Sequence, residues 1–198
     1  MSVAAWHMQR IRFHMLILFR LGISRLWNPG SKATMGKRWC QFMDRDKLPF
    51  HENGRYFVKN VSKLKEFNSS AYEGRIPAPS TLPAGTYLLS EWIDIRSEFR
   101  VFVYRDKILA VQNYLGFPLV FPDADKLVKM VEKYRGDDGW PEAYTMDVAV
   151  LCQKDQSAET VILEIHPFVS CGLYGFNHPL IPDMLEAGVQ YYIKSVHG

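Results

Sequence analysis

Glu164 and His166 are the residues whose types and spacing most directly suggest chemistry in this chain. They close the apolar run 161–165, which leads into a loop punctuated by glycines. Because side chains alternate along a strand, both residues point to one face and their apolar neighbours point to the other. Mg²⁺ prefers oxygen ligands and takes one or two carboxylates plus substrate phosphates. A carboxylate beside a second ligand-type side chain at a strand end therefore predicts a Mg²⁺–phosphate site.

A second acid, Asp147, interrupts the apolar segment 144–151 upstream. The connection 153–159 is polar, which suits a turn between two antiparallel strands. Pairing of the two strands would bring Asp147 near Glu164. An alternative is that Asp147 is an acid on a solvent-facing strand.

A third polar position lies on the segment 97–104, where Glu98 and Arg100 share one face of an expected strand. The planar guanidinium of arginine pairs with two phosphate oxygens at once. An arginine beside two metal-binding carboxylates would therefore make a good phosphate clamp. A structural ion pair between Arg100 and Glu98 is the alternative.

Five short motifs follow one another in the order Phe-Val-Lys, Ser-Glu-Trp-Ile, Glu-Phe-Arg, Met-Asp-Val and Leu-Glu-Ile. The first ends in Lys59, at the end of the apolar strand expected over 56–59. Over residues 28–195 this order resembles the ATP-grasp superfamily, and most of all its small members related to the RimK ligases. The order of the motifs is more specific than any single motif.

The resemblance implies roles for the residues that match the family's motifs. Lys59 is similar to the lysine that contacts nucleotide phosphates, and Arg100 to the phosphate or acyl-phosphate arginine. Glu98 is assigned to the nucleotide site together with Arg100. The hinge whose backbone reads the adenine edge is expected at Ser90, Glu91, Trp92 and Ile93.

The same resemblance implies that Asp147, Glu164 and His166 form the metal site. His166 stands where these proteins carry asparagine, and imidazole suits zinc, copper or iron better than magnesium. His166 is therefore interpreted either as a third metal ligand or as a phosphate contact.

By resemblance the expected function is an ATP-dependent carboxylate–amine ligase that uses ATP and Mg²⁺ and forms an acyl-phosphate. Its carboxylate and amine substrates would be small molecules, peptides or proteins. The alternative is a non-catalytic ATP-binding or protein-interaction module on a truncated ATP-grasp fold. The N-terminal region is too short for the additional α/β domain of full enzymes. We therefore expect a minimal unit, or one completed by a partner protein or a homo-oligomer.

Composition limits the other classes of function. The 198 residues suggest one domain or one domain with a small lobe, and 47% hydrophobic residues exclude a disordered chain. Three cysteines argue against a disulfide framework and predict a reducing, cytoplasmic location. The spacing of His166, Cys171 and His178 matches no zinc pattern. No base is placed to activate Cys171 as a nucleophile.

Charge is distributed unevenly along the chain. Residues 1–43 hold seven Lys or Arg and no acid, whereas the remainder holds 17 basic and 21 acidic residues. Such a segment suggests targeting, or contact with nucleic acid or anionic lipid, or a helix packed on the domain with solvated arginines. Nucleic-acid binding is the weakest of the functions considered. The apolar stretch 15–19 is too short to span a bilayer, so no transmembrane helix is expected.

The fold class we predict is α+β and ATP-grasp-like, with two antiparallel sheets, flanking helices and a nucleotide slot between the sheets. Residues 1–27 form a basic segment, followed by a domain over 28–198 that divides into a small lobe (28–86) and a C-terminal lobe (87–198).

The elements expected in these lobes follow from apolar periodicity and turn residues. Helices are expected over 32–43, from Pro122, and from Pro182 with an apolar stripe at Leu185, Val189, Tyr192 and Val196. Residues 68–86 are expected to form a mobile loop. Strands are expected over 56–59, 87–93, 97–104 and 108–114, with a hairpin over 144–166.

Overall fold

The computed structural model describes residues 33–35, 38–51, 53–60, 70–134, 141–152 and 157–197. The chain divides into two compact units, Met1–Ile93 and Asp94–Gly198. The expectations for residues 1–27 and for the turn at 135–139 lie outside the described residues.

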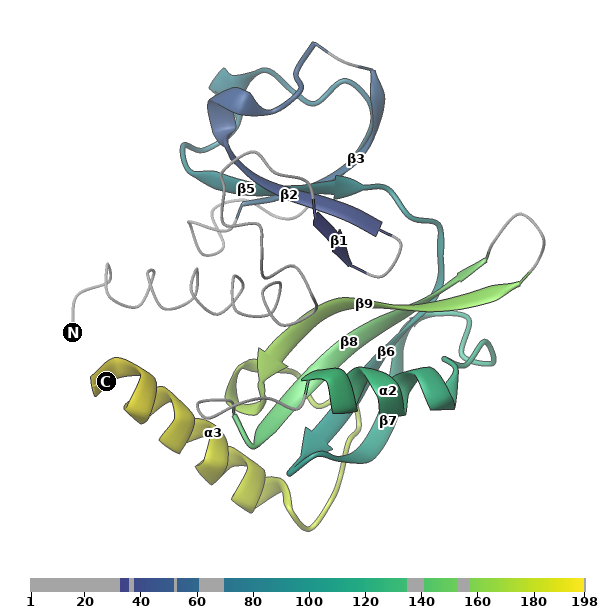
Figure 1. Ribbon diagram of the computed structural model, residues 1–198, viewed down its shortest axis with the longest axis vertical. Helices are drawn as coiled ribbons and strands as arrows, with labels where there is room; N and C mark the ends of the chain where they lie inside the picture. The colour runs from purple at the N-terminus through teal and green to yellow at the C-terminus, as the bar shows by residue number, and fades with distance from the viewer. Residues whose placement is uncertain are drawn as a thin grey trace. The chain divides into compact units, whose positions relative to one another are not determined.

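The first unit contains a five-stranded antiparallel sheet in the order β1-β2-β5-β3-β4 (Figure 1). Its strands are β1 (Ala33–Met35), β2 (Arg38–Asp44), β3 (Gly54–Asn60), β4 (Ser70–Gly74) and β5 (Thr86–Glu91), with 3₁₀ turns η2 (Arg45–Lys47) and η3 (Pro79–Thr81).

The helix expected over 32–43 is wrong, because this region contributes β1 and β2. Strand β2 pairs with β5 from Cys40 opposite Ser90 to Asp44 opposite Thr86. Aromatic residues in this segment, such as Phe42, also favour a pleated surface over a helix. Pairing with a strand 40 to 50 residues away in sequence therefore overrode the local helical spacing.

The mobile loop expected over 68–86 is also wrong in part, since it includes β4, which pairs with β3 at five positions. Ile76 and Leu82, which follow β4, are buried in the core. Strand β5 lies between β2 and β3, so the strand expected over 87–93 belongs to the first sheet. The units divide after Ile93, whereas the sequence placed the boundary after residue 86.

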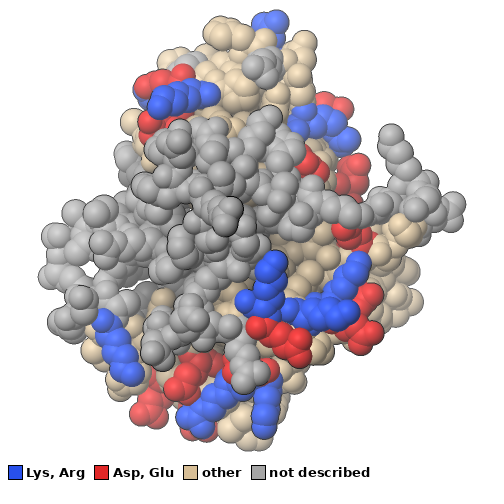
Figure 2. Space-filling view, viewed as in Figure 1, with Lys and Arg blue, Asp and Glu red and all other residues tan. Residues whose placement is uncertain are grey.

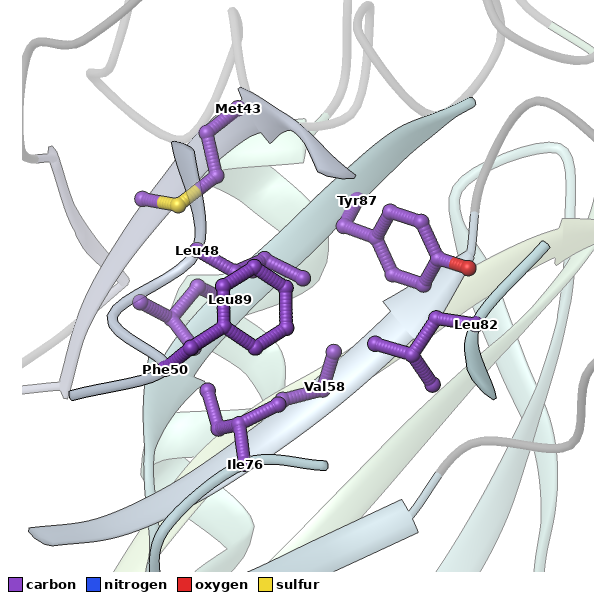
Figure 3. Close-up of a cluster of buried hydrophobic side chains, with 8 residues drawn as sticks. All are labelled: Met43, Leu48, Phe50, Val58, Ile76, Leu82, Tyr87 and Leu89. Carbon is purple, nitrogen blue, oxygen red and sulfur yellow. The ribbon is translucent and has the colours of Figure 1, made fainter. Parts of the chain in front are cut away.

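The core of the first unit gathers side chains from three strands and the segments between them (Figure 3). Tyr87 is fully buried, and its hydroxyl donates to the carbonyl oxygen of Pro83 at 2.7 Å. Val58 points into this core, so its neighbour Lys59 points to the opposite face of the sheet. The buried members are Met43, Leu48, Phe50, Val58, Ile76, Leu82, Tyr87 and Leu89.

The second unit contains a four-stranded antiparallel sheet in the order β7-β6-β8-β9 (Figure 1). Every strand expected there from the sequence is present. The elements are β6 (Ile95–Tyr104), β7 (Lys107–Gly116), α2 (Ala124–Tyr134), β8 (Ala143–Cys152), β9 (Ala158–Pro167), η4 (Phe168–Ser170) and α3 (Ile181–His197).

Helices α2 and α3 cover opposite faces of this sheet. Ala143 and Tyr144 are consecutive on β8 and therefore point to opposite sides. Ala143 packs in a cluster with Met184 of α3, whereas the ring of Tyr144 lies 4.8 Å from that of Tyr134 of α2. Both faces are thus covered, at least in part, by a helix.

The buried stripe expected on α3 is wrong, because Leu185 and Val189 are 44% and 49% exposed. The helix instead buries Met184 and brings Gly188 against η4. A Cβ on Gly188 would lie 2.6 Å from a methyl of Val169, so only glycine allows this close approach. The side chains of Tyr192 and Val196 lie outside the described residues.

Basic and acidic side chains are interspersed on the face of the described residues shown in Figure 2. In the part of the chain that the structure describes, no helix is both long and apolar enough to cross a bilayer.

Candidate active site

The central feature of the site is a row of three charged residues across adjacent strands of the second unit. Arg100 on β6 lies opposite Asp147 on β8, and Asp147 lies opposite Glu164 on β9. The next row on the same face holds Phe102, Thr145 and His166. The predicted pairing of Asp147 with Glu164 is confirmed, as is the shared face of Glu164 and His166.

Arg100 and Asp147 form a bidentate ion pair. Nε donates to Oδ1 and Nη2 donates to Oδ2, each at 2.7 Å, and both side chains are only 8% exposed. Arg100 Nη1 also donates to the carbonyl oxygen of Gly172 at 2.9 Å. Burial works against the charged guanidinium, but the hydrogen bonds and negative charge of Asp147 outweigh it and raise the pKa of Arg100.

This pair settles two alternatives left open by the sequence. Asp147 is buried and is not a solvent-facing acid. Arg100 is paired with Asp147, and Glu98 instead accepts a hydrogen bond from the hydroxyl of Tyr114 at 2.6 Å.

Two tyrosines that the sequence did not single out contact Arg100. The guanidinium carbon lies 4.8 Å from the ring centroid of Tyr174 and 5.7 Å from that of Tyr114. The two rings stack with centroids 4.9 Å apart. Burial, followed by the hydrogen bond to Glu98, raises the pKa of Tyr114 above its usual value, so its hydroxyl stays protonated. The only local signal in the sequence was an aromatic residue within the Gly-Leu-Tyr-Gly loop.

His166 lies between the two carboxylates. Its Nε2 is 3.2 Å from Glu164 Oε2 and 3.9 Å from Asp147 Oδ2. Glu164 is 23% exposed, which makes it the more accessible of the two acids. The nearby Cys171 donates its thiol to the carbonyl oxygen of Phe168, and burial raises its pKa. Cys171 is therefore a poor nucleophile.

The donor chemistry of this row fits magnesium, although the described residues contain no group of three His, Cys, Asp or Glu arranged to hold a metal ion. An ionised carboxylate has about four lone-pair sites, and Arg100 uses one on each oxygen of Asp147. Mg²⁺ takes one or two carboxylates and completes its shell with phosphates and water. Glu164 and Asp147 can supply those carboxylates, whereas the imidazole of His166 suits magnesium poorly.

The other predicted site residues belong to the first unit. Lys59 lies on β3 and Ser90 and Glu91 end β5, with Ser90 fully buried. The amide of Trp92 donates to the carbonyl oxygen of Arg55 at 3.3 Å, and the Arg55 guanidinium lies 4.7 Å above the Trp92 ring. The Trp92 amide is therefore already engaged.

Comparison with known families decides what this fold is. A family model described as an ATP-grasp domain, family 2 of its clade, matches residues 36–184. The chain belongs to this ATP-grasp family. No curated protein matches the sequence.

Solved structures share the ATP-grasp fold at low sequence identity. The ATP-grasp ligase PsnB with a minimal precursor aligns with a TM-score of 0.52 and 16% identity, over 92% of this chain and 62% of that one. A RimK domain protein from Sphaerobacter thermophilus gives 0.51 and 15%, over 93% and 66%. D-alanine–D-alanine ligase from Bacillus anthracis gives 0.51 and 12%, over 91% and 68%. This ATP-grasp chain thus spans less than two thirds of PsnB.

Proposed function

We propose that the protein is an ATP-dependent ligase that joins a carboxylate to an amine through an acyl-phosphate. Membership of the ATP-grasp family supports this, as does the shared fold with solved ligases. The row of Arg100, Asp147 and Glu164 is the observation that carries the proposal, because it combines a phosphate-binding cation with two carboxylates.

The proposed reaction needs positioning and charge neutralisation more than a protein nucleophile. A substrate carboxylate oxygen would attack the γ-phosphorus of ATP, and ADP would leave. The amine would then attack the acyl carbon and expel phosphate, with its proton passing to solvent. The absence of a nucleophile–base pair from these roles is therefore no objection.

Each named residue has a proposed part in this chemistry. Arg100 would hold a phosphate group with the donors that Asp147 and Gly172 leave unused. Glu164 and Asp147 would hold Mg²⁺, which supplies positive charge to the phosphates when bound. Lys59 and Glu98 are assigned to the phosphates and the nucleotide, and His166 to a phosphate contact. The adenine hinge is assigned to Ser90, Glu91, Trp92 and Ile93.

The substrates are proposed from the chemistry of the relatives. The PsnB structures contain a precursor peptide, so a peptide or protein is a reasonable source of the carboxylate or the amine. Completion of the site by a partner protein or a second copy is proposed because the chain spans only part of PsnB. The cysteine count supports a cytoplasmic location.

A non-catalytic ATP-binding or interaction module is the second candidate. The observation that favours it is the ion pair itself, because Arg100 already commits both its Nε and one Nη2 proton to Asp147. A ligase would release ADP and phosphate when a suitable acceptor is present, whereas a binding module would not.

Calorimetric titration with a non-hydrolysable ATP analogue, with and without Mg²⁺, tests the site. We expect magnesium-dependent binding that Glu164→Gln weakens by roughly tenfold or more, about 1.4 kcal/mol. Glu132→Gln, on the exposed side of α2, is the matched control and should bind like the natural protein. Absence of binding by the natural protein in either condition would contradict the proposal for this chain alone.

A further inference from the structure

Tyr174 has an unusual backbone conformation for a large side chain. Its φ is 47°, in the left-handed region that glycine adopts without cost. A non-glycine residue held in such a conformation costs on the order of 1–3 kcal/mol and persists only where its surroundings enforce it. The side chain is 51% exposed, so burial offers little compensation.

The contacts of this loop converge on Arg100. The Tyr174 ring lies over the guanidinium, and the carbonyl oxygen of Gly172, two residues earlier, accepts a hydrogen bond from Nη1. The other side of the arrangement is Tyr114, which stacks on Tyr174 with 17° between the ring planes. Tyr114 is itself anchored by the hydrogen bond to Glu98.

These contacts define how much of Arg100 is left for a ligand. A guanidinium has five N–H donors. Asp147 and Gly172 use three of them, which leaves one donor on Nη1 and one on Nη2 outside these contacts. A ring stacked over a guanidinium restrains the plane in which all its donors lie.

We propose that Tyr174 is a positioning residue that holds the guanidinium of Arg100 in one plane, so that its two remaining donors are presented to a phosphate group. The phosphate ligand rests on the proposed function, but the restraint on Arg100 does not. The strained backbone of the loop is the cost of placing an aromatic ring at this point.

Hydrogen exchange of the Arg100 Nε proton, followed by ¹H–¹⁵N NMR and assigned with Arg100→Lys, tests the restraint directly. Loss of the stacked ring in Tyr174→Ala should speed exchange about five- to tenfold, whereas Tyr174→Phe should exchange like the natural protein. Tyr174→Gly should exchange as fast as Tyr174→Ala while keeping or raising the melting temperature, because glycine relieves the strain.

Phe117→Ala is the matched control, since it removes a similarly exposed aromatic ring from the same unit and should not change the Arg100 signal. Unchanged exchange in Tyr174→Ala, or equal acceleration in Tyr174→Phe, would overturn the positioning role. Affinity for the ATP analogue should fall in Tyr174→Ala and Tyr174→Gly and be retained in Tyr174→Phe. If the natural protein binds no nucleotide, the proposed function fails, and the exchange measurement still decides the role of Tyr174.

Discussion

One face of the second sheet carries two regions of opposite character. The charged half consists of Arg100, Asp147, Glu164 and His166, and the apolar half consists of Phe102, Phe168, Phe176 and Met184. In the apolar half the rings of Phe102 and Phe176 stack with centroids 4.1 Å apart. Arg100 and Phe102 lie only two positions apart along β6.

The two halves stabilise the protein by different amounts. Burying an apolar side chain contributes about 1.5–3 kcal/mol. A buried ion pair loses most of its Coulombic gain to desolvation and is a weak source of net stability. We infer that the apolar half supplies the stability of this face, and that the charged half is maintained by its paired geometry.

The largest effect is expected from breaking the ion pair on one side only. Asp147→Ala should lower the free energy of unfolding by about 3–5 kcal/mol, because it leaves a buried guanidinium without its counter-charge. Replacing both partners, as Arg100→Met with Asp147→Leu, should restore most of that loss but abolish magnesium-dependent nucleotide binding. Urea unfolding measures the stability of each variant.

Met184→Ala is the reference in the apolar half, with an expected loss of about 3 kcal/mol from transfer and cavity terms. Nucleotide binding should survive this change. If the double replacement of Arg100 and Asp147 were as destabilising as Asp147→Ala alone, the ion pair would be a net source of stability and the comparison would fail.

An intermediate effect is expected from adding one methyl group at a glycine in each half. Gly188→Ala should destabilise the protein by about 1–2 kcal/mol, because its Cβ would meet Val169 at 2.6 Å. Gly172→Ala should change stability by less than about 0.5 kcal/mol, because its nearest neighbours lie at 3.6 Å. Thermal unfolding compares the two variants, and equal destabilisation would show that the apolar half is no more tightly packed.

The smallest effect concerns Tyr114 and appears with pH. Its folded-state pKa is raised above the ordinary value of 10.0, so its contribution to stability is complete below pH 10 and falls as the pH rises further. Tyr114→Phe should cost about 1 kcal/mol at neutral pH through the lost hydrogen bond. Above pH 10 its stability should decline less steeply than that of the natural protein. Urea midpoints between about pH 8 and 11 measure this, and parallel slopes would contradict the prediction.

The sequence was sufficient where the pattern is local. Alternation with period two placed Glu164 and His166 on one face, and the polar connection between two apolar strands predicted that Asp147 pairs beside Glu164. The succession of short motifs was enough to indicate the ATP-grasp family. Lys59 and the residues 90–93 remain predictions for the nucleotide site.

The tertiary structure alone decided matters that depend on distant segments. The region 32–43 became strands because a partner strand was available for pairing. The buried stripe of α3 was set by the close approach of Gly188 to Val169, since the helix is apolar on more than one side.

The same division applies to the site. Strand periodicity, which is local, determined that Arg100 lies on a face with other polar groups. Which carboxylate it pairs with, and that Gly172 and Tyr174 complete its surroundings, depended on chain segments 47 to 74 residues further along. Periodicity fixes the direction of a side chain, but only the packing of strands and loops in three dimensions selects its partners.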